Sequence, residues 1–173
     1  MDYLSLLKVA KRDAERLVTT YPIPKEVRQS DTYEALPQFL LAHCLVQRLK
    51  GDYTRVRIEF PFKRGGRVKH RVDVVAGNDF NHAPLLVEVK PVWDWDKSAR
   101  GWMERDVLAD ANKLAELRDS RSYWEGSKLN KCAVVVALFK KPSPDPKRSK
   151  EFESLRDYCK NRSVELLFLR MYP

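Results

Sequence analysis

The sequence is poor in the residues that build disulfides and zinc sites. Its 173 residues include three cysteines and three histidines. The cysteines are odd in number, and each lies inside an apolar or amphipathic segment: Cys44, Cys132 and Cys159. Such cysteines are typical of reduced core thiols in a cytoplasmic protein, so we expect no disulfide. Because the histidines show no paired spacing, we expect no zinc site either.

Long apolar runs are also missing. No segment approaches the about 20 predominantly apolar residues that a membrane-spanning helix needs. The first residues, MDYLSLLKVAKRDAERL, place an acid second and then mix charged with apolar residues. A secretory signal has the opposite organisation, a basic start followed by an apolar run. We therefore expect a soluble protein of the cytoplasm.

What the sequence does contain is an excess of positive charge. Lys and Arg number 33 against 24 Asp and Glu, which gives a formal net charge of +9. Apolar residues make up 43% of the chain, a proportion that suits a globular protein. The length suits one domain over residues 1–173, with a helix at 3–18 as an N-terminal extension. A basic chain favours polyanionic partners, because their counterions are released on binding.

Hydrophobic spacing predicts a mixed α/β chain. Helical spacing appears at residues 3–18, 31–50, 103–119 and 147–162, and strand patterns appear at 55–60, 68–75, 85–89, 132–139 and 164–169. The start of the second helix is open, either at Asp31 or near Pro37. The valine-rich run at 132–139 indicates a strand covered on both faces, as in a parallel sheet. This order predicts a mixed central sheet with helices on both sides.

Two of these strands carry polar residues within apolar surroundings. Because side chains alternate along a strand, Val72 and Val74 should share one face and Asp73 should lie on the other. In the segment Val-Glu-Val-Lys at 87–90, Glu88 and Lys90 should likewise share one face. If the two strands form a hairpin, the two carboxylates and the lysine converge on one side of the sheet.

Converging carboxylates favour a divalent cation. Two carboxylates repel each other unless a positive charge lies between them. Mg²⁺ or Mn²⁺ would fill that place, since Mg²⁺ prefers one or two carboxylates together with water and phosphate oxygens. Such an ion polarises a phosphate and lowers the pKa of a bound water. Lys90 is placed to orient the attacking water or to stabilise developing charge. The alternative is an ion pair between strands, Glu88 with Lys90 or Arg71, without chemistry.

The segment GGRVKHRVDVV at 65–75, followed by LLVEVK at 85–90, resembles the signature of the PD-(D/E)XK nuclease superfamily. Val72 stands where that signature has its proline. The resemblance covers roughly residues 30–140. It implies a restriction-endonuclease-like three-layer fold and metal-dependent cleavage of nucleic acid. It also implies Asp73 and Glu88 as metal ligands, the backbone carbonyl of Val89 as a further ligand and Lys90 as a catalytic residue.

Other residues are secondary candidates. Glu34, on the helix before the first strand, would approach the metal as a further catalytic acid, or else it caps that helix in a box with Asp31. On the helix after the signature, Asp106, Asp110 and Lys113 share a face. We expect a local ion pair between Asp110 and Lys113 there, the alternative being a polar side chain aimed at the site. The cations expected to contact nucleic acid are Lys69, Arg71, Lys97, Arg100 and Lys113.

Together these features predict a metal-dependent endonuclease that uses Mg²⁺ or Mn²⁺. We expect DNA as its substrate, with RNA as the alternative. A homodimer would let such an enzyme cut two strands, although no sequence feature decides this. The rival hypothesis is a catalytically inactive module that binds nucleic acid or assists assembly and retains the nuclease fold.

Overall fold

In a computed structural model, the chain begins with helices, continues with three consecutive strands and ends with helices and strands in alternation. The structure describes residues 2–24, 35–77, 85–93, 97–120, 131–142 and 150–173, and only the backbone at 53, 97–100, 102 and 151. In chain order the elements are α1 (Tyr3–Thr20), α3 (Leu36–Arg48), the 3₁₀ helix η2 (Tyr53–Arg55), β1 (Val56–Arg64), β2 (Arg67–Ala76), β3 (Leu85–Val92), α4 (Lys97–Asp119), β4 (Lys131–Leu138), α5 (Lys150–Asn161) and β5 (Val164–Arg170).

The strands form one mixed sheet in the order β1-β2-β3-β4-β5. β1, β2 and β3 pair antiparallel, while β3, β4 and β5 pair parallel. The prediction that 132–139 is a central parallel strand is confirmed, because β4 lies between two parallel neighbours and is buried over nearly its whole length.

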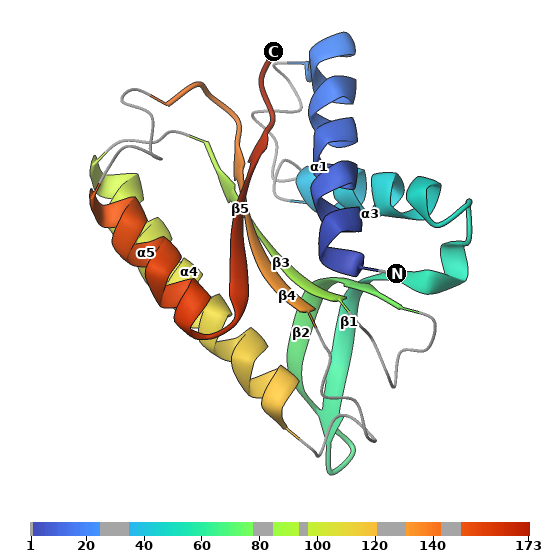
Figure 1. Cartoon of the computed structure of the whole chain (residues 1–173), viewed down its shortest axis with the longest axis vertical. Coiled ribbons are helices and arrows are strands. Elements are labelled where there is room, and N and C mark those ends of the chain that lie inside the picture. Colours follow the sequence, from blue (N-terminus) through green and yellow to red (C-terminus); the bar gives the residue numbers. More distant parts are fainter. Residues whose placement is uncertain (1, 25–34, 78–84, 94–96, 121–130, 143–149) are drawn as a thin grey trace.

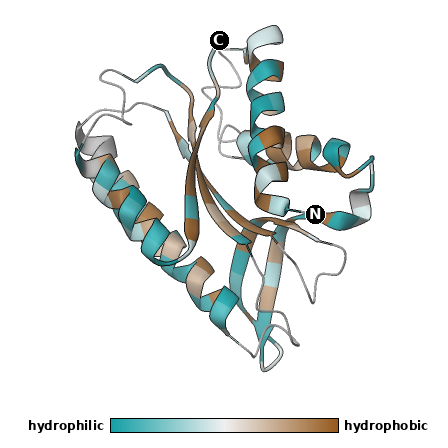
Figure 2. Cartoon of the chain, in the orientation of Figure 1, coloured by the Kyte–Doolittle hydropathy of each residue, from teal (hydrophilic) through white to brown (hydrophobic). Residues whose placement is uncertain are grey.

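Helices cover both faces of this sheet. Figure 1 shows α1 and α3 on one side and α4 and α5 on the other. One buried cluster fills the space beneath α1 and α3, and a second fills the space beneath α4 and α5. The central strands are correspondingly hydrophobic, whereas the helices carry many hydrophilic residues (Figure 2). The expected α/β arrangement of three layers is therefore confirmed.

Element boundaries shift where caps and prolines act. α3 begins at Leu36, with Pro37 in its first turn, so the start near Pro37 is the correct alternative. Proline suits this position because the first helical N–H groups have no partner within the helix. Asp31 and Glu34 lie outside the described residues. α4 begins at Lys97, six residues before the predicted start.

The pleat of β2 is interrupted at Asp73. Val74 packs with the cluster beneath α1 and α3, whereas Val72 packs with the cluster beneath α4. The expectation that these two valines share a face is therefore wrong. β2 pairs with β3 only from Val74 to Ala76. On β1, between the pairs Ile58–Val74 and Phe60–Val72, Glu59 has φ of 52°, in the left-handed region that non-glycine residues seldom adopt. The irregularity turns the outer half of the hairpin relative to its base.

The structure bears on two expectations from the sequence, one about the cysteines and one about membrane-spanning helices. All three cysteines are free and buried, as expected. Burial raises the pKa of the Cys132 thiol to about 12, so this cysteine is a poor nucleophile. Within the described ranges, no helix is both long and apolar enough to cross a bilayer.

Candidate active site

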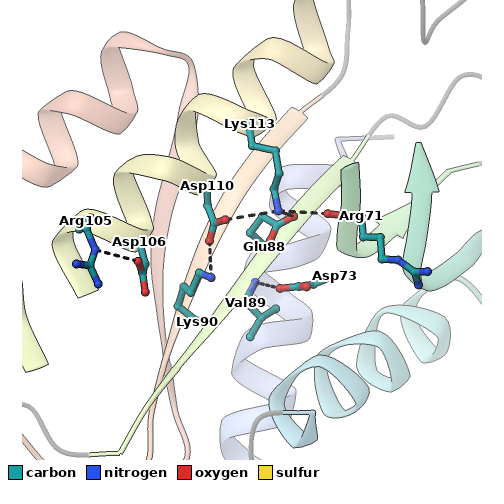
Figure 3. Close-up of polar contacts among 9 residues, drawn as sticks. All are labelled: Arg71, Asp73, Glu88, Val89, Lys90, Arg105, Asp106, Asp110 and Lys113. Atoms are coloured by element: carbon teal, nitrogen blue, oxygen red, sulfur yellow. Dashed lines mark hydrogen bonds and ion pairs between the residues drawn. The ribbon is translucent and has the colours of Figure 1, made fainter. Parts of the chain in front are cut away.

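The candidate site lies between β3 and α4. Glu88 and Lys90 point toward α4, where they meet its side chains (Figure 3). Val87 and Val89, which alternate with them, pack on the opposite face beneath α1 and α3. The predicted separation of the two faces of β3 is thus confirmed. Glu88 is 2% exposed, and burying a carboxylate so deeply is costly unless it has a charged partner.

Asp73 joins the site where β2 and β3 separate. One more step of the antiparallel register would place Asp73 opposite Glu88, but the pairing stops at Val74. The backbone N–H of Val89 donates instead to Asp73 Oδ2 at 2.6 Å. The carboxylate thus takes the place of a strand carbonyl and holds the two diverging strands together. This contact fixes Asp73 beside Glu88 and Lys90 despite the interrupted pleat.

α4 contributes two charged residues to the same site. Lys90 Nζ lies 3.1 Å from Asp110 Oδ2. Lys113 Nζ lies 2.7 Å from Glu88 Oε1 and 3.5 Å from Asp110 Oδ1, and it also donates to the carbonyl of Arg71 at 3.2 Å. Figure 3 shows both α4 side chains aimed at β3. The ion pair between Asp110 and Lys113 that we expected is present, but it is one link in a network that reaches Glu88 and Lys90.

The helical pattern contains a signal that identifies Asp110. The apolar stripe of α4 that packs on the sheet consists of buried residues at 103, 107, 111, 114 and 117. Position 110 lies three residues after 107 and four before 114, which places it on this stripe. An acid at a core position of an amphipathic helix needs a buried partner. Asp110 is 7% exposed, and Lys90 and Lys113 are its partners.

Burial and mutual repulsion dominate the electrostatics of the carboxylates. Burial raises the pKa of Glu88 to about 8, and the Asp73 carboxylate adds to this rise while Lys113 opposes it. Burial also raises the pKa of Asp73. Burial alone would lower the pKa of Lys90, but the surrounding carboxylates, Asp110 first, outweigh it and raise the pKa. Lys90 therefore stays charged, while the two strand carboxyls gain from any added positive charge.

These residues fit a divalent ion in part. Among the described residues, no group of three or more His, Cys, Asp or Glu side chains is placed to hold a metal. Mg²⁺ needs only one or two carboxylates when water and phosphate oxygens complete its shell, and Asp73 and Glu88 supply that number. The buried oxygens Glu88 Oε1 and Asp110 Oδ2 already face positive charge, since Lys113 Nζ lies 2.7 Å from the first and Lys90 Nζ lies 3.1 Å from the second. A divalent ion at Glu88 would take the place that the Lys113 ammonium now holds.

The structure bears on the remaining predicted site residues only in part. Glu34 lies outside the described residues. Lys97 and Arg100 lie in the first turns of α4, about 20 Å of helix before Lys113 at ~1.5 Å per residue, and their side chains are not described. Lys69 and Arg71 are exposed on β2, and the guanidinium of Arg71 points away from the carboxylates (Figure 3).

Two predicted roles stay predictions. Lys113 was expected to contact nucleic acid, but its ammonium lies inside the site against Glu88. Val89 contributes its N–H to Asp73, and no contact that we describe tests its carbonyl as a metal ligand.

Comparisons with known proteins add little. No protein-family model matches the chain, and no curated protein matches it. Among solved structures, the chain has a likeness to the CdiA-CT/CdiI toxin and immunity complex from Yersinia pseudotuberculosis. The two are 16% identical with a TM-score of 0.31, over 56% of this chain and 80% of the other. A TM-score this low does not establish a shared fold, so the likeness assigns neither fold nor function.

Proposed function

We propose that this protein is a divalent-metal-dependent nuclease with a restriction-endonuclease-like fold, acting on DNA. The observation that carries the proposal is the pairing of the buried Glu88 carboxyl with the partly buried Asp73 carboxyl, both with raised pKa values, beside the charged Lys90. Stability alone gives little reason for such a cluster, since a buried ionic network is often no more stabilising than apolar packing. Perturbed carboxyls that share a site with a lysine are typical of a catalytic centre.

Each residue has a proposed role. Asp73 and Glu88 would hold Mg²⁺ or Mn²⁺, which when bound polarises the scissile phosphate and lowers the pKa of a water. The Lys90 side chain is 26% exposed and holds its ammonium 3.1 Å from Asp110, where it can meet a phosphate oxygen and stabilise the charge that develops on it. Asp110 acts through Lys90 and is a positioning residue.

Lys113 has a separate proposed role as a counter-charge. Its ammonium lies 2.7 Å from Glu88 Oε1, where a metal bound by that oxygen would meet it. A positive charge there keeps the carboxylates from repelling one another when no metal is bound. Lys113 is 24% exposed and sits on a flexible stem, so it can shift its ammonium when a divalent ion binds.

The rival function also has an observation in its favour. The lysines of the site already neutralise Glu88 and Asp110, and a network satisfied in this way could persist in a module that binds nucleic acid without cleaving it. The two hypotheses differ in what Mg²⁺ does to a bound substrate.

A plasmid-nicking assay separates the two functions. We expect the wild-type protein to convert supercoiled plasmid to open circles or linear DNA with Mg²⁺ or Mn²⁺, and to leave it intact in EDTA. A protein that retards the plasmid on a gel and never cuts it with either ion would support the non-catalytic module. Structured RNA assayed in parallel decides between the two nucleic acids.

Asp110 offers a sharper test of the assigned roles. We expect Asp110→Asn to lower the nicking rate about tenfold to a hundredfold, because residues that orient a catalytic group carry effects of about this size. The effect should vanish in a Lys90→Met background, since Asp110 acts through that lysine. Asp106→Asn is the matched control, because Asp106 is one turn away on α4 and pairs with Arg105. Equal losses in both backgrounds would contradict the positioning role.

A further inference from the structure

The outer half of the β1–β2 hairpin is a basic arm, which we define as residues 60–72. This stretch contains no acid and five cations: Lys63, Arg64, Arg67, Lys69 and Arg71. All five are exposed. The net charge of the whole chain is +9, so these thirteen residues hold more than half of that excess. Figures 1 and 2 show the hairpin projecting beyond the sheet, with hydrophilic stretches along it.

The arm has two different faces. Phe62 and Val72 are buried in the cluster beneath α4, and Phe60 packs against that cluster. His70 Nε2 lies 3.9 Å from Glu116 on α4, so a polar contact adds to the apolar ones. The side chains that alternate with these residues on β2, including Lys69 and Arg71, face solvent. Packing therefore holds the base of the arm against the cluster beneath α4, and the cations extend into solvent from that base.

The arm is also joined directly to the candidate active site. The carbonyl of Arg71 accepts a hydrogen bond from Lys113, and Asp73 follows two residues later on the same strand. Because β2 has left β3 at this point, the ribbon beyond it consists of β1 and β2 alone. A polymer that lies along the arm would run toward the carboxylates, whereas a small ligand at the carboxylates would not reach the arm's end.

We infer that the basic arm is the docking surface for the phosphate backbone of a duplex nucleic acid, and that it delivers the duplex to the carboxylates. The second part, delivery of the duplex to the carboxylates, rests on the proposed function. A two-stranded β-ribbon fits the major groove, which is about 12 Å wide. The six residue steps from Glu59 to Gly65 extend about 20 Å at ~3.3 Å each, a length that spans several base pairs at ~3.4 Å per step.

An alternative explanation is protection of the sheet edge. Isolated charges on an edge strand prevent pairing with other chains. That purpose needs charge of either sign and is served by one or two residues. Five cations without an acid, on both strands and next to the site, are better explained by a polyanionic partner.

Equilibrium binding tests the arm without any cleavage. A labelled duplex is titrated in EDTA over a range of salt concentrations with the wild type and with the triple variant Lys63→Gln/Arg64→Gln/Arg67→Gln. Three lost phosphate contacts should lower the slope of log K against log salt by about 2.7, at ~0.9 per contact. Near physiological salt, the affinity should fall at least about tenfold. The variant Arg64→Lys/Arg67→Lys keeps the charge and should bind nearly as the wild type does.

The matched control removes the same charge elsewhere. Lys150→Gln/Arg156→Gln/Lys160→Gln acts on exposed cations of α5 and also leaves a net charge of +6, from +9 minus three. It should bind duplex within about twofold of the wild type, because salt screens the attraction between the duplex and surface charges distant from the interface. Equal losses in the two triple variants would overturn the inference, since net charge alone would then explain the binding.

Two further outcomes would also overturn it. If the wild type bound a single strand as tightly as the duplex, docking of the arm in a duplex groove would be contradicted. Preferential binding to phosphatidylserine vesicles, lost in the arm variant, would assign the arm to a membrane surface. Circular dichroism of each variant confirms that it is folded. Duplex binding that depends on the arm, without cleavage in Mg²⁺, would leave this docking role standing and refute the proposed nuclease.

Discussion

Asp73→Asn is expected to lower the rate of metal-dependent plasmid nicking about a thousandfold or more. Coordination by a divalent ion stabilises transition-state charge by several kcal/mol, and about 4 kcal/mol corresponds to a thousandfold in rate. The amide keeps the shape of the carboxyl, and its oxygen can still accept from the N–H of Val89, as Asp73 Oδ2 does at 2.6 Å. The substitution therefore removes charge from the site while retaining the contact that joins β2 to β3.

The comparison needs an equally conservative change outside the site. Asp157→Asn removes one exposed carboxylate from α5 and should nick DNA at the wild-type rate. Initial rates are measured at saturating Mg²⁺, and thermal unfolding checks that both variants are folded. If Asp73→Asn cleaves plasmid within about tenfold of the wild type, Asp73 supplies less than ~1.4 kcal/mol to the transition state and is not a metal ligand.

The sequence predicts β3 well because its pattern is simple. Glu88 and Lys90 alternate with valines in an otherwise apolar strand. Because a strand in a parallel sheet is covered on both faces, a charged side chain on it does not simply face solvent and indicates a site. Their common face and their separation from Val87 and Val89 follow from this alternation alone. Parallel pairing of the valine-rich β4 follows from the same reasoning.

The sequence does not predict how Asp73 reaches the site. Alternation places Val72 with Val74, whereas the structure divides them between two clusters. The interruption depends on the positive φ of Glu59 and on the early end of pairing between β2 and β3. A period of two along one strand carries no information about them.

The sequence also underestimates α4. Asp110 and Lys113 suggest a surface ion pair when only their spacing is considered. The apolar stripe shows that position 110 faces the sheet, and the structure confirms that this acid is buried. Its contact with Lys90 depends on how far α4 lies along β3, which helical periodicity alone cannot specify. Comparing each polar residue with the apolar stripe of its helix is therefore more informative than counting charge spacings.

The metal-free protein is expected to lose stability as the pH rises from about 5 toward 8, and Glu88 is expected to cause most of the loss. Burial raises the pKa of Glu88 from 4.5 to about 8 in the folded protein. Between these values the folded protein holds a proton that the unfolded chain releases, so higher pH favours unfolding. The stabilisation is complete below about 4.5 and is lost as the pH passes 8. The raised pKa of Asp73 acts in the same direction.

Urea unfolding in EDTA at several pH values measures this loss. For one proton, the free energy of unfolding should fall by at most about 1.4 kcal/mol per pH unit, or about 2.5 kcal/mol between pH ~5.5 and ~7.5. Glu88→Gln cannot titrate and should flatten the curve, whereas Glu153→Gln, an exposed substitution on α5, should not change it. Mg²⁺ competes with the proton for Glu88, so its stabilising effect should grow with pH in the wild type and disappear in Glu88→Gln. If the wild type and Glu88→Gln gave parallel curves with and without Mg²⁺, Glu88 would be neither the buried titrating group nor a metal ligand.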